Sequence, residues 1–93
     1  MEDLIEELPV EVKALENFLL YIKFQNGEEK IYDMKEVLKF DYYKNLREKE
    51  NFKRVSVFGI TLKWSTGEDI APEKIYFNSI PLSEFNSKIK EMK

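Results

Sequence analysis

The Asn26-Gly27 pair is the feature that most constrains the fold of this chain. It separates two apolar-rich runs of β-forming residues, 18–24 and 29–32. An Asn-Gly pair supplies the positive φ angles that both central residues of a type I′ turn require. The sequence therefore predicts a β-hairpin over residues 18–32. One face of its first strand carries Phe18, Leu20, Ile22 and Phe24.

Strand and turn signals continue on both sides of this hairpin. Residues 10–14 alternate between apolar and polar side chains, and a tight connection is expected at Glu16-Asn17 because Asn tolerates a positive φ. Two further strands are expected over 52–58 and 60–65, joined by a turn at Gly59. Because hairpin connections favour antiparallel pairing, we expect one antiparallel sheet of about five strands.

Helical patterns occupy the rest of the chain. Two short helices are expected within about 34–49, capped by Asp33 and Asp41 and covering one face of the sheet. A helical turn is expected near 72–77, and an amphipathic C-terminal helix over 82–92. The fold class is thus α+β, with all 93 residues in one domain that begins with an acidic extension over residues 1–8.

The chain contains no histidine and no cysteine. Disulfides, Cys and His zinc sites, and catalytic triads built on His or Cys are therefore excluded. The three glycines are each accounted for by a turn, which leaves none for a phosphate-binding loop. We expect no enzymatic activity, no cofactor and no metal site.

The N-terminal segment is acidic and lacks the basic and apolar regions of a secretory signal. No apolar run approaches the ~20 residues that cross a bilayer. The expected location is therefore the cytoplasm, with no membrane association.

Several stretches of the chain are similar to the DUF2442 family, a family of small bacterial α+β domains. They are residues 10–12, 20–28 and 31–33, followed by the motif Trp64-Ser65-Thr66-Gly67-Glu68-Asp69-Ile70-Ala71-Pro72-Glu73. The resemblance covers residues 9–77. It implies the α+β fold but no catalytic residues. Some relatives resemble members of two-gene toxin–antitoxin pairs, and others carry a C-terminal helix-turn-helix domain, for which too few residues follow Phe77 here.

The closing motif is the first candidate site. Its carboxylates can bind a divalent cation through oxygen atoms, form part of a partner surface, or simply stabilise the turn and the helix start while Trp64 fills the core. In the structural interpretation, Asp69 bonds backbone amides at the start of the following helix. The residues concerned are Trp64, Glu68, Asp69 and Glu73.

The second candidate is the basic segment 34–63, which holds eight Lys or Arg residues against four Asp or Glu residues. Basic side chains interleaved with aromatic ones can bind nucleic acid, although they can equally form the solvated face of helical segments or attract an acidic protein. The candidate nucleic-acid surface comprises Lys39, Lys44, Arg47, Lys53 and Arg54.

The two ends are the third candidate, because both carry apolar stripes outside the family-like body. These stripes either pack on their own domain or bind a partner. The candidate partner surface comprises Leu4, Ile5, Leu8, Phe85, Ile89 and Met92.

These features favour a non-enzymatic protein-interaction module, with the hypothesis that it is the antitoxin-like member of a two-gene pair. The expected partner is a small protein or a second copy of the chain. One alternative is a nucleic-acid-binding accessory domain that uses residues 35–54. Another is a homodimer with a purely structural role.

Overall fold

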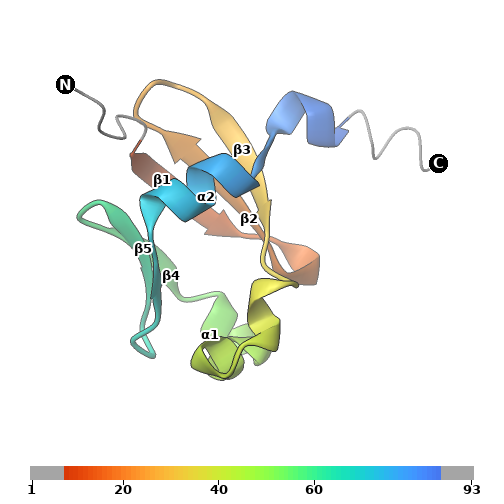
Figure 1. Cartoon of the computed structure of the whole chain (residues 1–93), viewed down its shortest axis with the longest axis vertical. Helices are drawn as coiled ribbons and strands as arrows, with labels where there is room; N and C mark the ends of the chain where they lie inside the picture. Colours follow the sequence, from red (N-terminus) through yellow and green to blue (C-terminus); the bar gives the residue numbers. More distant parts are fainter. Residues whose placement is uncertain (1–7, 87–93) are drawn as a thin grey trace.

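Two antiparallel sheets and several short helical segments make up residues 8–86, the part of the chain that the computed structural model describes (Figure 1). The first sheet has the order β1-β2-β3-β7, with β1 Pro9–Ala14, β2 Leu19–Phe24, β3 Glu29–Asp33 and β7 Ile80–Pro81. The second has the order β4-β5-β6, with β4 Val55–Phe58, β5 Thr61–Trp64 and β6 Asp69–Ile70. The predicted α+β class is confirmed.

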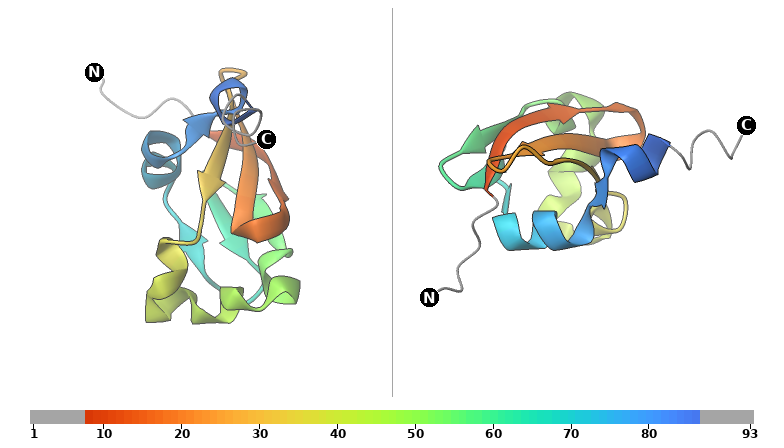
Figure 2. Two further views of the ribbon diagram at one scale, coloured as in Figure 1. Left: turned by 90° about the vertical axis from the view of Figure 1, so that its right-hand side faces the viewer. Right: turned by 90° about the horizontal axis from the view of Figure 1, so that it is seen from above.

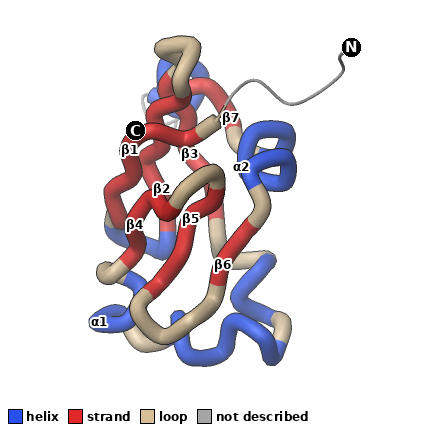
Figure 3. Tube along the Cα trace, turned by 90° about the vertical axis from the view of Figure 1, so that its left-hand side faces the viewer, coloured by secondary structure: helices blue, strands red, loops and turns tan. Residues whose placement is uncertain are grey.

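The strands do not form the single sheet that we expected. β1 and β4 run next to each other, but no ladder of hydrogen bonds joins them, so each is the edge of its own sheet (Figure 3). Alternating apolar residues identify a strand, whereas its neighbour is chosen by tertiary packing, which a periodic pattern does not encode.

The predicted hairpin of β2 and β3 is confirmed, but its turn type is wrong. The loop has three residues, 25–27, and of these only Gly27 has a positive φ, at 93°. The amide of Gly27 donates to the carbonyl of Phe24 over 2.9 Å, as in a type I turn followed by a left-handed residue. Asn26 contributes through its side chain instead, whose Oδ1 accepts the amide of Glu28 over 2.9 Å.

The tight connection before β2 is confirmed and is more strained than expected. It forms the short 3₁₀ segment η1 Glu16–Phe18, in which Asn17 has φ 61° and Phe18 has φ 59°. A left-handed conformation suits Asn but is rare for a bulky aromatic residue.

The helical segments between β3 and β4 are mostly 3₁₀ rather than α-helical. They are η2 Val37–Lys39, η3 Asp41–Arg47 and α1 Lys49–Phe52. They lie at one end of the sheets, whereas we expected them to cover one face (Figures 1 and 2). The side chain of Asp33 accepts the amide of Lys35 over 2.9 Å in the turn that precedes η2, while η2 itself begins at Val37 without a side-chain cap. The predicted cap at Asp41 is wrong, since η3 begins without a side-chain cap. The strand predicted from residue 52 begins only at Val55, because Phe52 ends α1.

The remaining helices follow the predicted pattern. α2 Pro72–Asn78 starts with a proline in its first turn, where the missing amide costs nothing. Residues 82–86 are helical, which confirms the start of the predicted C-terminal helix, and the rest of that helix lies outside the described residues.

One hydrophobic cluster takes side chains from both sheets and from the helical segments. Its largest fully buried members include Trp64, Phe24, Leu20, Ile22, Met34, Leu46, Leu62 and Ile75. Burial of such side chains is the main source of stability in a domain of this size.

Candidate functional site

Trp64 belongs to the core of the protein. Its side chain is 1% exposed, and its indole Nε1–H donates to the backbone carbonyl of Phe52 over 3.0 Å. The rings of the two residues lie 6.3 Å apart. Trp64 therefore joins β5 to α1 instead of offering a surface for a ligand.

Glu68 is the one buried charged residue within 8–86, with 4% of its surface exposed. It accepts hydrogen bonds from the hydroxyl of Thr66 and, over 3.1 Å, from the side-chain amide of Asn45 in η3. Burial alone would raise the pKa of Glu68, but these two bonds and its own backbone amide together lower the pKa below its usual value. The carboxylate thus attaches η3 to the β5–β6 hairpin.

Asp69 continues this attachment. Its Oδ1 accepts the hydroxyl of Tyr42 over 3.1 Å, and its backbone carbonyl accepts the hydroxyl of Tyr43 over 3.0 Å. The prediction that Asp69 caps the following helix is wrong, because α2 begins after Ala71 without a side-chain cap.

Glu73 is exposed in the first turn of α2, and within residues 8–86 its side chain forms no hydrogen bond or ion pair with the other motif residues. Within residues 8–86, no group of three or more acidic side chains is arranged to hold a metal ion. Three residues of the motif therefore have a structural role: Trp64, Glu68 and Asp69 connect the β5–β6 hairpin to α1 and η3.

The basic candidates do not form one surface of unpaired charges. Arg47 donates to the carbonyls of Leu38, over 2.7 Å, and Lys39, and so holds the end of η2. Lys39 pairs with Glu36 at 3.1 Å and Lys53 with Glu50 at 3.8 Å, both in solvent. Among the described residues, Lys44 and Arg54 are exposed and form no ion pair.

Only part of the candidate surface at the two ends can be placed. Leu8 is partly buried, and its carbonyl accepts the amide of Gln25 over 2.8 Å. Phe85 is also partly buried. The other four residues lie outside the described part of the chain, namely Leu4, Ile5, Ile89 and Met92.

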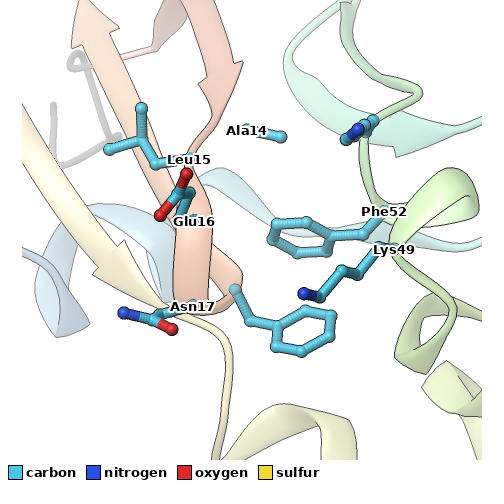
Figure 4. Close-up of a pocket in the computed structure, with 8 residues that line it drawn as sticks. Ala14, Leu15, Glu16, Asn17, Lys49 and Phe52 are labelled. Carbon is cyan, nitrogen blue, oxygen red and sulfur yellow. The ribbon is translucent and has the colours of Figure 1, made fainter.

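A pocket that the sequence does not predict lies between η1 and α1 (Figure 4). It has a volume of about 370 Å³, within the range of small-ligand sites. Its apolar part includes Phe18 and Phe52, whose ring centroids lie 5.1 Å apart in an edge-to-face arrangement. Lys49 and Lys53 line the α1 side, and Glu16 lines the opposite side. Residues 14–18 and 49–53 are too distant in the sequence for a local pattern to connect them.

A second missed feature is an apolar corner, which we define as Val10, Phe58 and Ile60. These side chains are 53%, 64% and 55% exposed. Phe58 and Ile60 flank Gly59 in the β4–β5 turn, and the figures place this turn beside the start of β1 (Figures 1 and 2). The available signal was the turn itself, since residues next to a hairpin turn are usually exposed.

The tyrosines with shifted pKa values all shift towards the protonated form. A hydrogen bond from Tyr21 to Glu29 raises the pKa of that tyrosine to about 12, and burial raises the pKa of Tyr32 to about 12. Burial also raises the pKa of Tyr43. All three hydroxyls are therefore protonated at neutral pH, and those of Tyr21 and Tyr43 donate to Glu29 and to the carbonyl of Asp69.

Comparison with known proteins gives one match. A family model described as "Protein of unknown function (DUF2442)" covers residues 9–81. No curated protein and no solved structure matches the chain. None of the helices within residues 8–86 is long and apolar enough to span a membrane.

Proposed function

This chain belongs to the DUF2442 family, and we propose that it acts as a non-enzymatic protein-interaction module whose partner binds at the apolar corner. The partner is a small protein encoded next to it, and the chain has the antitoxin-like role in that pair.

The exposure of Val10, Phe58 and Ile60 is the observation that carries the proposal. Val10 and Phe58 lie within β1 and β4, and Ile60 lies just before β5, yet all three side chains are more than half exposed. Grouped apolar side chains on a surface are typical of interaction sites, because their burial against a partner is favourable. The ammonium group of Lys63 lies 4.9 Å from the ring centroid of Phe58, so a partner with an acidic rim suits this corner.

The acidic side chains of the motif, together with Glu28, support the same interpretation. Glu68 and Asp69 bind η3, and Glu28 accepts the hydroxyl of Tyr76 over 2.5 Å. Each of these acids is used to attach one element of the fold to another. A catalytic acid or base, by contrast, would be expected to face a cleft with its pKa moved towards neutrality.

Co-expression with the product of the adjacent gene tests the proposal. The expected result is a complex that co-elutes through affinity and size-exclusion steps. A neighbouring protein that never co-elutes would contradict it.

Variants locate the binding surface. The double substitution Phe58→Asp and Ile60→Asp should abolish co-elution while leaving the fold intact, because both side chains are exposed. A matched control is Phe77→Asp, since Phe77 is equally exposed but lies on α2. Loss of the complex in the control alone would place the interface elsewhere.

The two alternatives are distinguished by simple measurements. A structural homodimer predicts a dimeric mass for the isolated chain in light scattering. A nucleic-acid-binding domain predicts an affinity that falls steeply with salt. The nucleic-acid alternative has less support, because Arg47 is engaged with backbone carbonyls and Lys39 and Lys53 pair with neighbouring acids.

A further inference from the structure

The pocket between η1 and α1 combines an apolar interior with positive charge on one side. We infer that it binds an amphipathic carboxylate, in which a ring or branched alkyl group carries one carboxylate. This inference is independent of the interaction at the apolar corner. The same chemistry occurs in a free aryl carboxylate and in the C-terminal residue of a polypeptide.

The interior of the pocket suits a ring of modest size. Phe52 is almost fully buried, while Phe18 remains partly exposed with the edge-to-face contact between them. A third ring can add to such a pair with favourable aromatic geometry. The volume of about 370 Å³ leaves room for a ring and a short chain.

The position of the charges favours an anion. Lys49 and Lys53 are four residues apart on and just after α1, so they lie on the same side of the pocket. Figure 4 shows the ammonium group of Lys49 directed into the space between η1 and α1. Within residues 8–86, the only ion pair of Lys53 is the exposed one with Glu50 at 3.8 Å, which contributes little and which a ligand carboxylate can displace.

Glu16 determines which anions fit. Its carboxylate lies across the pocket from Lys49 (Figure 4). A ligand with one carboxylate can meet the lysines and keep its apolar end near Glu16. A dianion would place its second charge towards Glu16 and is disfavoured.

The wall formed by η1 is fixed before any ligand arrives. The left-handed conformation of Phe18 is strained, whereas Asn17 tolerates its own, and strained backbone is often found at binding sites. Three bonds hold this segment in place. They are Lys35 Nζ to the Asn17 carbonyl (3.0 Å), the Met34 amide to the Phe18 carbonyl (3.0 Å) and the Leu15 amide to the Leu19 carbonyl (2.8 Å).

The opposite wall is fixed through the family motif. Trp64 donates to the carbonyl of Phe52 and so holds the ring that forms part of the interior. A site with both walls in place loses little conformational entropy when a ligand binds. Trp64 thereby helps to position one wall of the pocket, although it does not line the pocket itself.

An NMR titration of the full chain with phenylacetate tests the inference. We expect shifts confined to the amides of residues 14–18 and 49–53, with a Kd on the order of 1 mM for so small a probe. Phenylacetamide, which has the same ring and no charge, should bind at least about threefold more weakly. Equal binding of the two probes, or shifts spread away from the pocket, would overturn the inference.

Charge variants sharpen the test without threatening the fold, since both lysines are exposed. Lys49→Gln should weaken phenylacetate binding about threefold, and the Lys49→Gln and Lys53→Gln double variant roughly tenfold. Lys44→Gln is the matched control, because Lys44 is exposed outside the pocket, and it should leave the Kd unchanged. An unchanged Kd in the double variant would contradict the proposed role of the charges.

Two further arms identify the source of the carboxylate. N-acetylphenylalanine represents a free ligand, and a hexapeptide ending in phenylalanine represents a polypeptide C-terminus. Tighter binding of the peptide indicates a polypeptide, whereas equal or weaker binding indicates a free carboxylate. The C-terminally amidated peptide must lose binding, and its retention would overturn the inference. The Phe58→Asp and Ile60→Asp double variant should leave the Kd for these carboxylates unchanged. This control distinguishes ligand binding in the pocket from partner binding at the apolar corner.

Discussion

The β2–β3 and β5–β6 hairpins are built on the same loop but use it in different surroundings. In each, an aromatic residue precedes the loop, a glycine with positive φ ends it and a glutamate follows. The amides of Phe24 and Trp64 donate to the carbonyls of Glu28 and Glu68 over 2.8 and 2.9 Å. Glu28 is exposed and binds α2 through Tyr76, whereas Glu68 is buried and binds η3 through Asn45. The same loop therefore connects each hairpin to a different helical segment. Burial decides how much each connection contributes to the free energy of unfolding.

The aromatic residues before the loops should give the largest effects. Phe24→Ala and Trp64→Ala each remove a buried ring and should lower the free energy of unfolding by about 4 kcal/mol. Trp64→Ala should cost about 1 kcal/mol more, because the Phe52 carbonyl loses its buried donor. Urea unfolding measures both, with Phe58→Ala as the exposed aromatic control. A larger cost for Phe24→Ala would reverse the expected order.

Substitution of the glutamate that follows each loop should reveal the clearest difference in stability between the two hairpins. Glu68→Gln replaces one of two buried accepting oxygens by an NH₂ group, so that Asn45 or Thr66 loses its acceptor, and should cost about 2 kcal/mol. Glu28→Gln should leave the free energy of unfolding unchanged within error, since the residue is in solvent. Comparable losses in the two variants would show that burial does not distinguish these attachments.

Alanine substitutions of the two loop glycines should lower the free energy of unfolding by similar amounts. Gly27 has φ 93° and Gly67 has φ 107°, and a Cβ at either position meets open space. Gly27→Ala and Gly67→Ala should therefore each cost about 1.5 kcal/mol from backbone strain alone. Thermal unfolding of the two variants provides the comparison, and a clear inequality would mean that the loops differ in geometry.

Lowering the pH should reduce the contribution of Glu68 to the free energy of unfolding. Its pKa is lower in the folded protein than the usual 4.5, so its ionised form is favoured by folding. The stability gap between the wild type and Glu68→Gln should be full above pH 4.5 and should shrink as the pH falls through the lowered value. Urea titrations at stepped pH measure this gap. A gap that stays constant on acidification would contradict the assigned shift.

Much of the fold could be predicted from the sequence, because it is encoded locally. Alternating residues located the main strands, Pro72 located the start of α2, and Asn17 located the turn before β2. Two details required the structure. The type of the first loop depends on Gly27 alone, and the positive φ of Phe18, whose ring packs against the distant Phe52, has no local signal in the sequence.

Less of the candidate site could be predicted. The motif residues were identified, but their contacts with Tyr42, Tyr43 and Asn45 join segments more than twenty residues apart. The apolar corner was missed for a different reason. Phe58 and Ile60 continue an apolar strand pattern, and only their positions around the Gly59 turn place them in solvent.

The binding affinity of the neighbouring gene product tests the central claim that the apolar corner is the interaction surface. Isothermal titration calorimetry should give a Kd below about 1 µM for the wild type. The Phe58→Asp and Ile60→Asp double variant, shown by circular dichroism to be folded, should bind at least roughly thirtyfold more weakly. An unchanged Kd in that folded variant, or no heat of binding with the wild type, would contradict the claim.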